Sequence, residues 1–133
     1  MKIIILFFGL LIIVSGANYS VIVSKKLSYL TVSSHEIRDV FLQKRHTIGD
    51  QKLIPINLVG QDDARSTFES VILGMDRNRL NSYWIKQHFA GVNPPVTQPS
   101  YESIKSFVQN VDGAIGYIPS KMMDNSVKAV YEF

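Results

Sequence analysis

The residues best suited to binding chemistry lie between positions 62 and 67. Arg65, Ser66 and Thr67 fall in the first turn of a predicted helix. Asp62 or Asp63 precedes them and can cap that helix. Because a helix start offers unpaired backbone N–H groups and an arginine can bind an oxyanion through two hydrogen bonds, the segment predicts an oxyanion site. The simpler interpretation is a capped helix with a surface ion pair between Arg65 and one aspartate.

Other chemistries have less support in the sequence. Asp62 and Asp63 could contribute to a cation site, but no third acidic residue follows at the spacing of a calcium loop. The histidines, His35, His46 and His88, do not have the spacing of a zinc motif, and no serine lies in G-x-S-x-G. The chain has no cysteine, which excludes disulfides and thiolate metal sites. We therefore expect no enzyme, no metal and no cofactor.

The first 17 residues have the pattern of a secretory signal peptide. Lys2 supplies a positive charge, an apolar run covers 3–14, and the small residues Ser15, Gly16 and Ala17 follow. The apolar run of about 12 residues is shorter than the roughly 20 that a membrane-spanning helix needs, although an uncleaved anchor is the alternative. The pattern predicts cleavage after Ala17, a periplasmic or secreted location, and no stable membrane span after cleavage.

The remaining residues, 18–133, are enough for one domain with its own hydrophobic core. The whole chain has a formal net charge of +3, and its positive residues are dispersed along the sequence. Because nucleic-acid-binding proteins usually gather such charges on one face, we expect no nucleic-acid partner.

Periodicity and caps place the elements that must hold these residues. Ser33 and Glu36 have the spacing of a capping box. Phe68, Val71 and Ile72 mark the inner face of the helix that follows Asp62. The predicted strands are 19–24, 53–59, 114–118 and 127–131, and the predicted helices begin at the caps Ser33, Asp62 or Asp63, Asp76 and Ser100.

Strands separated by helices predict an α/β fold with helices over a small sheet. Pro55 places strand 53–59 at an edge of the sheet, or places the proline at the end of its strand. The helix capped by Asp76 contains the aromatic residues Tyr83, Trp84 and Phe89. We expect them in the core, with an exposed stripe that meets a partner as the alternative.

Several segments in their order along the chain resemble one family. They are Glu36–Leu42, Gly49–Ile56, Arg65–Phe68, Tyr83-Trp84 with Phe89–Gly91, and Asp112–Ile118. This ordered set is similar to the phosphate ABC-transporter substrate-binding proteins, which are type 2 periplasmic binding proteins. The resemblance spans residues 21–130, and its strongest part is Gly113–Ile118.

The resemblance implies a single three-layer-like lobe of a type 2 periplasmic binding protein, with a small mixed sheet flanked by helices. The family has two lobes that close on the ligand, whereas this chain has room for one. The family holds phosphate on Ser-Gly-Thr at a helix start, where this chain has Asp62 and Asp63. Gly113 could allow a ligand to approach the backbone, although a tight turn explains it equally.

The implied function is an exported solute-binding protein that takes phosphate or another small oxyanion for an ABC transporter. A second copy or a partner protein would complete the cleft. The alternative is an interaction or assembly module, built on one lobe, that binds no ligand.

Overall fold

The structure is a computed structural model that describes residues 18–60 and 62–133. The predicted signal peptide, residues 1–17, lies outside the described residues. Within them, no helix is both long enough and apolar enough to cross a membrane.

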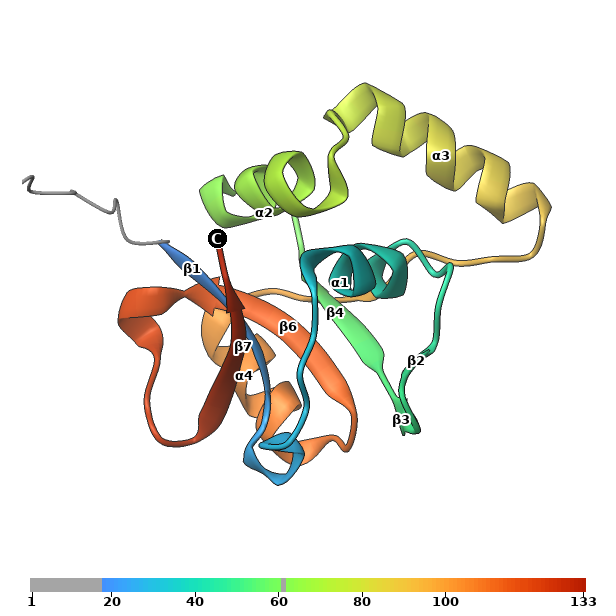
Figure 1. The fold of residues 1–133 in the computed structure, drawn as a ribbon. Coiled ribbons are helices and arrows are strands. Elements are labelled where there is room, and N and C mark those ends of the chain that lie inside the picture. Colours follow the sequence, from blue (N-terminus) through green and yellow to red (C-terminus); the bar gives the residue numbers. More distant parts are fainter. Residues whose placement is uncertain (1–17, 61) are drawn as a thin grey trace, which may run out of the picture.

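A five-stranded mixed sheet with the order β5-β4-β6-β1-β7 forms the centre of the fold (Figure 1). β4 runs parallel to both β5 and β6, whereas β1 runs antiparallel to both β6 and β7. The strands of this sheet are β1 (Tyr19–Ser24), β4 (Ile54–Leu58), β5 (Val96–Gln98), β6 (Ala114–Pro119) and β7 (Val127–Glu132). A separate hairpin is made of β2 (Thr47–Ile48) and β3 (Gln51–Lys52).

Helices cover both faces of the sheet. The helices are α1 (Ser34–Phe41), α2 (Asp63–Phe68), α3 (Arg77–Phe89) and α4 (Tyr101–Asn110). Gly116 in β6 faces α4, because a Cβ atom there would lie 2.7 Å from Cγ2 of Ile104. The next residue, Tyr117, packs against Phe41 of α1 and Phe68 of α2. Since successive side chains in a strand point to opposite faces, α4 forms one outer layer and α1 with α2 forms the other. The predicted three-layer lobe is confirmed.

Three buried aromatic rings fasten α1 and α2 to the sheet. The rings of Phe68 and Tyr117 stack with centroids 4.3 Å apart, and Phe41 meets Phe68 edge-on at 4.6 Å. These contacts fix the direction in which α2 leaves β4, and therefore the position of Asp62 at its start.

The predicted helix caps are confirmed. The Ser33 hydroxyl accepts a hydrogen bond from the Glu36 N–H at 3.1 Å, and the Glu36 carboxylate accepts one from the Ser33 N–H at 3.1 Å. Asp76 caps α3, and Ser100 caps α4. Each cap satisfies backbone N–H groups that the helix itself leaves unpaired, which explains why local sequence marks these ends.

The inner face predicted for the second helix is partly wrong. Phe68 and Ile72 are buried, but the Val71 side chain is 58% exposed. The reason is that a π-helical turn, Glu69–Leu73, continues α2 and rotates its last residues relative to a regular α-helix. The turn ends at Gly74, as expected, with φ of 65°.

The predicted edge position of the proline strand is also wrong, because β4 lies between β5 and β6. Ile54 donates its N–H to Gly113 on the β6 side. Neighbouring residues of a strand point their backbone groups to opposite sides, so an N–H at position 55 would point to the β5 side. Proline has no N–H to donate there. Pairing with β5 begins only at Ile56, so the proline lies beyond the end of β5. The short strands β2, β3 and β5 were not predicted.

Candidate ligand-binding site

A cleft of about 600 Å³ lies where β4 and β6 end. Asp62 and Asp63 follow the carboxyl end of β4, and Ser120 to Met122 follow that of β6. Ligands of open α/β sheets usually bind outside the carboxyl ends of the strands, which makes this cleft the candidate site. The lining residues are Asn18, Tyr19, Asp62, Asp63, Tyr101, Pro119, Ser120, Lys121 and Met122.

Asp62 ties together two helix starts in the wall of this cleft. Its Oδ1 accepts a hydrogen bond from the Ala64 N–H at 2.8 Å and another from the Tyr101 hydroxyl. Tyr101 is the first residue of α4, so this carboxylate joins α4 to the start of α2. Burial, followed by the bond to Asp62, raises the pKa of Tyr101 well above its usual value. The Tyr101 hydroxyl therefore stays protonated and donates to Asp62 throughout the neutral range.

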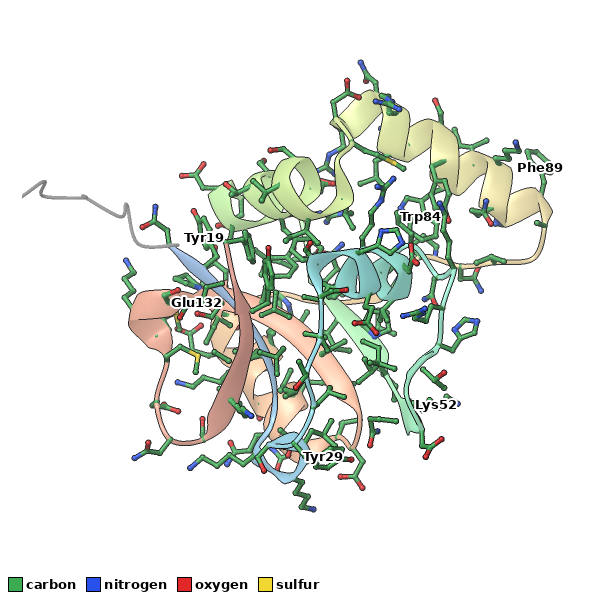
Figure 2. All side chains as sticks on the ribbon, viewed as in Figure 1. Tyr19, Tyr29, Lys52, Trp84, Phe89 and Glu132 are labelled. Carbon is green, nitrogen blue, oxygen red and sulfur yellow. The ribbon has the colours of Figure 1, made fainter. Side chains whose placement is uncertain are left out.

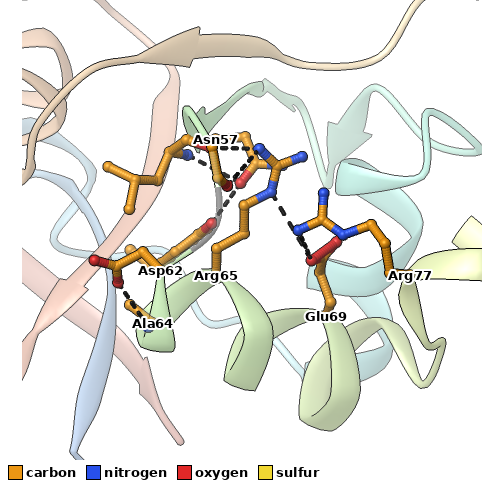
Figure 3. A network of polar contacts seen from close by, with 9 residues as sticks. Asn57, Asp62, Ala64, Arg65, Glu69 and Arg77 are labelled. Atoms are coloured by element: carbon orange, nitrogen blue, oxygen red, sulfur yellow. Dashed lines mark hydrogen bonds and ion pairs between the residues drawn. The ribbon is translucent and has the colours of Figure 1, made fainter. Parts of the chain in front are cut away.

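Arg65 points away from the cleft into the protein. Its Nη1 donates to the carbonyl oxygens of Leu58 at 2.8 Å and Gly60 at 3.2 Å (Figure 3). Its Nε lies 3.9 Å from Oε1 of Glu69. The expected ion pair with Asp62 or Asp63 is therefore replaced by one with Glu69. The guanidinium holds the end of β4 against α2, and ligand binding by Arg65 stays a prediction.

Glu69 is a buried carboxylate that the sequence analysis did not single out. Its side chain is 5% exposed, and its Oε1 lies 2.8 Å from Nη2 of Arg77. The spacing of Arg65 and Glu69, four residues apart in a helix, is the signal that could have indicated this pair. Because a buried carboxylate is costly without a cationic partner, Arg65 and Arg77 are needed to keep Glu69 inside.

The other predicted site residues lie apart from the cleft. Ser66 lines a smaller hollow of about 250 Å³ next to Glu69, and Thr67 is half-buried outside the cleft. Gly113 precedes β6, whereas Asp62 follows β4. Since β4 and β6 are parallel, these two residues lie at opposite ends of the sheet.

Gly113 has a structural reason to be glycine. Its φ is 82°, in the left-handed region, and a Cβ atom there would press against the carbonyl oxygen of Lys52. It lines a separate hollow of about 320 Å³ beside Asp112 and Lys26. The structure thus brings Asp62, but not Gly113, to the candidate site.

Several lining residues were not singled out by the sequence analysis, among them the polar residues Tyr19, Tyr101, Ser120 and Lys121. Tyr19 and Tyr101 begin β1 and α4, and Ser120 and Lys121 are the first two residues after β6. Two carboxylates, one ammonium group and several hydroxyl groups make the cleft polar and mixed in charge. Carboxylates only accept hydrogen bonds, so a ligand that contacts Asp62 or Asp63 must donate one.

The fold is that of one lobe of a periplasmic substrate-binding protein. The structure is similar to an ABC-type phosphate transport receptor from Vibrio cholerae, with a TM-score of 0.68 and 18% identity, over 86% of this chain and 45% of that chain. It is also similar to a protein from Clostridium perfringens, assigned as a phosphate ABC transporter substrate-binding protein and solved with bound phosphate. That match has a TM-score of 0.66 and 21% identity, over 86% of this chain and 44% of the other.

The chain thus spans less than half the length of either of these proteins, as expected for a single lobe. No family model matches the chain. Both similar proteins are transport proteins, and at these identities the likeness shows the fold.

Proposed function

We propose that this chain forms one lobe of a solute-binding protein, with a binding rather than a catalytic role, and that its solute occupies the cleft beside Asp62. The observation that carries the proposal is the position of this polar cleft at the carboxyl ends of two parallel strands. The similar protein from Clostridium perfringens binds phosphate with the same fold, which supports a solute of that kind.

The proposed ligand is phosphate or another small oxyanion that still carries a proton. Lys121 supplies a positive charge to the cleft, whereas Asp62 and Asp63 repel an anion that cannot donate a hydrogen bond. Phosphate carries at least one proton at neutral pH and sulfate carries none. The cleft should therefore prefer phosphate to sulfate.

A single lobe offers only one wall to its ligand, while small-molecule sites usually enclose most of the ligand surface. We propose that a second protein surface, either another copy or an ABC transporter, supplies the opposite wall. The alternative is an interaction module that binds no solute. It is favoured by Asp62, whose Oδ1 is already engaged by Ala64 and Tyr101.

We further propose that residues 1–17 direct export, that cleavage follows Ala17, and that residues 18–133 act in the periplasm. The sequence pattern of the segment supports this. Intact mass of the protein recovered from the periplasm tests it, since a retained segment contradicts cleavage.

Titration calorimetry and thermal shift with phosphate, sulfate and neutral solutes test the binding proposal. Phosphate at about 100 times its dissociation constant should add about 2.7 kcal/mol of stability. Lys121→Gln should weaken phosphate binding about tenfold, because it removes a charge from the cleft wall. Ser66→Ala, outside the cleft, is the matched control and should bind as the unaltered chain does.

If no solute produces heat in calorimetry or a shift in melting temperature, solute binding is contradicted. The interaction module is then the remaining proposal. Analytical ultracentrifugation then tests the interaction module. An interaction module should self-associate or hold a partner through the cleft face, so Lys121→Glu should change its sedimentation.

A further inference from the structure

α3 is attached to the protein along one face only. Leu80 is buried, and Tyr83 and Trp84 are half-buried against the core. The Tyr83 hydroxyl donates to the carbonyl oxygen of Leu42 at 2.6 Å. Figures 1 and 2 show α3 extending away from the sheet beyond α1, with Trp84 on the inner side and Phe89 at the outer end. The expectation of an aromatic core is therefore only partly right for Tyr83 and Trp84, which pack half-buried against it, and wrong for Phe89.

The opposite face of α3 carries two large apolar side chains in solvent. Ile85 is 62% exposed and Phe89 is 86% exposed. Residues four apart are neighbours on a helix surface, so these two side chains form one apolar tip at the end of α3.

One cation borders this apolar tip, and a second lies farther toward the start of α3. Lys86 lies one turn before Phe89, and Arg79 lies two turns before Lys86 on the same side of the helix. Among the described residues, neither forms an ion pair, whereas Arg77 is paired with Glu69. The sequence has no aspartate or glutamate from position 77 to 101. The nearest acidic residue along α3 is its cap, Asp76, about 20 Å from Phe89 along the helix.

We propose that the end of α3 docks on a bilayer surface that contains anionic lipid. Phe89 and Ile85 enter the headgroup layer, and Arg79 and Lys86 contact lipid phosphates. Exposed aromatic and aliphatic residues beside cations on a helix are the features that hold a helix at such an interface.

Two features favour a lipid surface over a protein. A stable protein interface buries roughly 800 Å² on each partner, and two side chains at a helix tip supply only a small part of that. A second copy docked through the same tip would bring the Arg79 and Lys86 residues of both copies together, which like charges oppose. A lipid surface needs only a few inserted side chains, and each nearby cation adds to the attraction.

Co-sedimentation with vesicles tests the proposal. We expect the full chain to bind vesicles of phosphatidylcholine with about one third phosphatidylglycerol more tightly than vesicles of phosphatidylcholine alone. Ile85→Ser with Phe89→Ser, and separately Arg79→Gln with Lys86→Gln, should each weaken this binding about tenfold or more. All variants share residues 1–17, so any membrane affinity of that segment cancels in the comparison.

Matched controls come from exposed residues elsewhere. Val71→Ser and Lys25→Gln lie outside α3 and should bind anionic vesicles as the unaltered chain does. Fluorescence of Trp84, the single tryptophan, reports whether α3 keeps its packing in each variant. Equal binding by the α3 variants and the unaltered chain, or no preference for anionic vesicles, overturns the proposal. Binding to polyglutamate through α3, without binding to vesicles, also overturns it in favour of an acidic protein partner.

Discussion

Arg65 donates a hydrogen bond from Nη1 to the carbonyl oxygen of Leu58 at 2.8 Å, which turns the guanidinium away from the cleft. The residue that the sequence offers as the best oxyanion ligand thereby connects the last residue of β4 to α2. The cleft is left with Lys121 as the cation in its lining. Arg65 therefore contributes to the stability of the lobe, while Lys121 supplies the positive charge of the candidate site.

Arg65→Ala should destabilise the fold by about 1.5–3 kcal/mol, because it removes a charged donor from two carbonyl groups and weakens the pairing of Glu69. We expect phosphate affinity to stay within about twofold. Urea denaturation and calorimetry on the same variant check both statements. Loss of affinity with unchanged stability would show instead that Arg65 contacts the ligand.

Gly113→Ala should destabilise the fold by at least about 2 kcal/mol, since it adds a contact with the Lys52 carbonyl to an unfavourable left-handed backbone. Gly91→Ala is the matched control, because Gly91 has φ of 79° but nothing within 4 Å of the added Cβ atom. It should cost only about 1 kcal/mol. Thermal denaturation compares the two, and equal losses would mean that the Lys52 contact relaxes without cost.

Stability should fall as pH rises above about 10, in part through Tyr117. Burial raises the pKa of Tyr117 above its usual value of 10.0. In that range the unfolded chain loses the phenolic proton while the folded protein retains it, so unfolding becomes more favourable. Tyr117→Phe should reduce this slope by up to about 1.4 kcal/mol per pH unit.

The readout for Tyr117→Phe is the dependence of the urea midpoint on pH, compared with the unaltered chain. The variant should also be less stable at neutral pH, because it loses the hydrogen bond that Tyr117 donates to Asn57. That loss does not depend on pH and is therefore not the test. Tyr83 and Tyr101 also have raised pKa values and should keep part of the slope in the variant. An unchanged slope means that Tyr117 ionises as easily in the folded protein as in the unfolded chain.

Ser33→Ala should cost about 1 kcal/mol, because it removes the acceptor for the Glu36 N–H at the start of α1. Ser33→Asp keeps an oxygen at the cap and should remain near the unaltered stability. A melting temperature lowered by several degrees in the alanine variant alone is the expected result. Equal melting temperatures for all three chains would show that the capping box adds no net stability.

Local features of the fold were predictable from the sequence alone. The capping box of Ser33 and Glu36, the caps of α3 and α4, and strand β6 depend on neighbouring residues and on short-range periodicity. β5 was not predictable because it has three residues and is held by pairing with β4, which lies far from it in sequence. The π-helical turn after α2 was also missed, because it shifts the apolar pattern of a regular α-helix by only a fraction of a turn.

The candidate site likewise has features that the sequence predicts and features that only the tertiary structure sets. The sequence predicted a helix cap after β4 at Asp62 or Asp63, because a cap is a contact between residues two or three apart, and the structure shows that it is Asp62. Only the tertiary structure decided that Tyr101 and Lys121 join Asp62 in one cleft, that Arg65 faces inward and that Gly113 lies at the far end of the sheet. These outcomes depend on which strands become neighbours and in which direction they run. That choice is made by burial of the whole core, which no short stretch of sequence encodes.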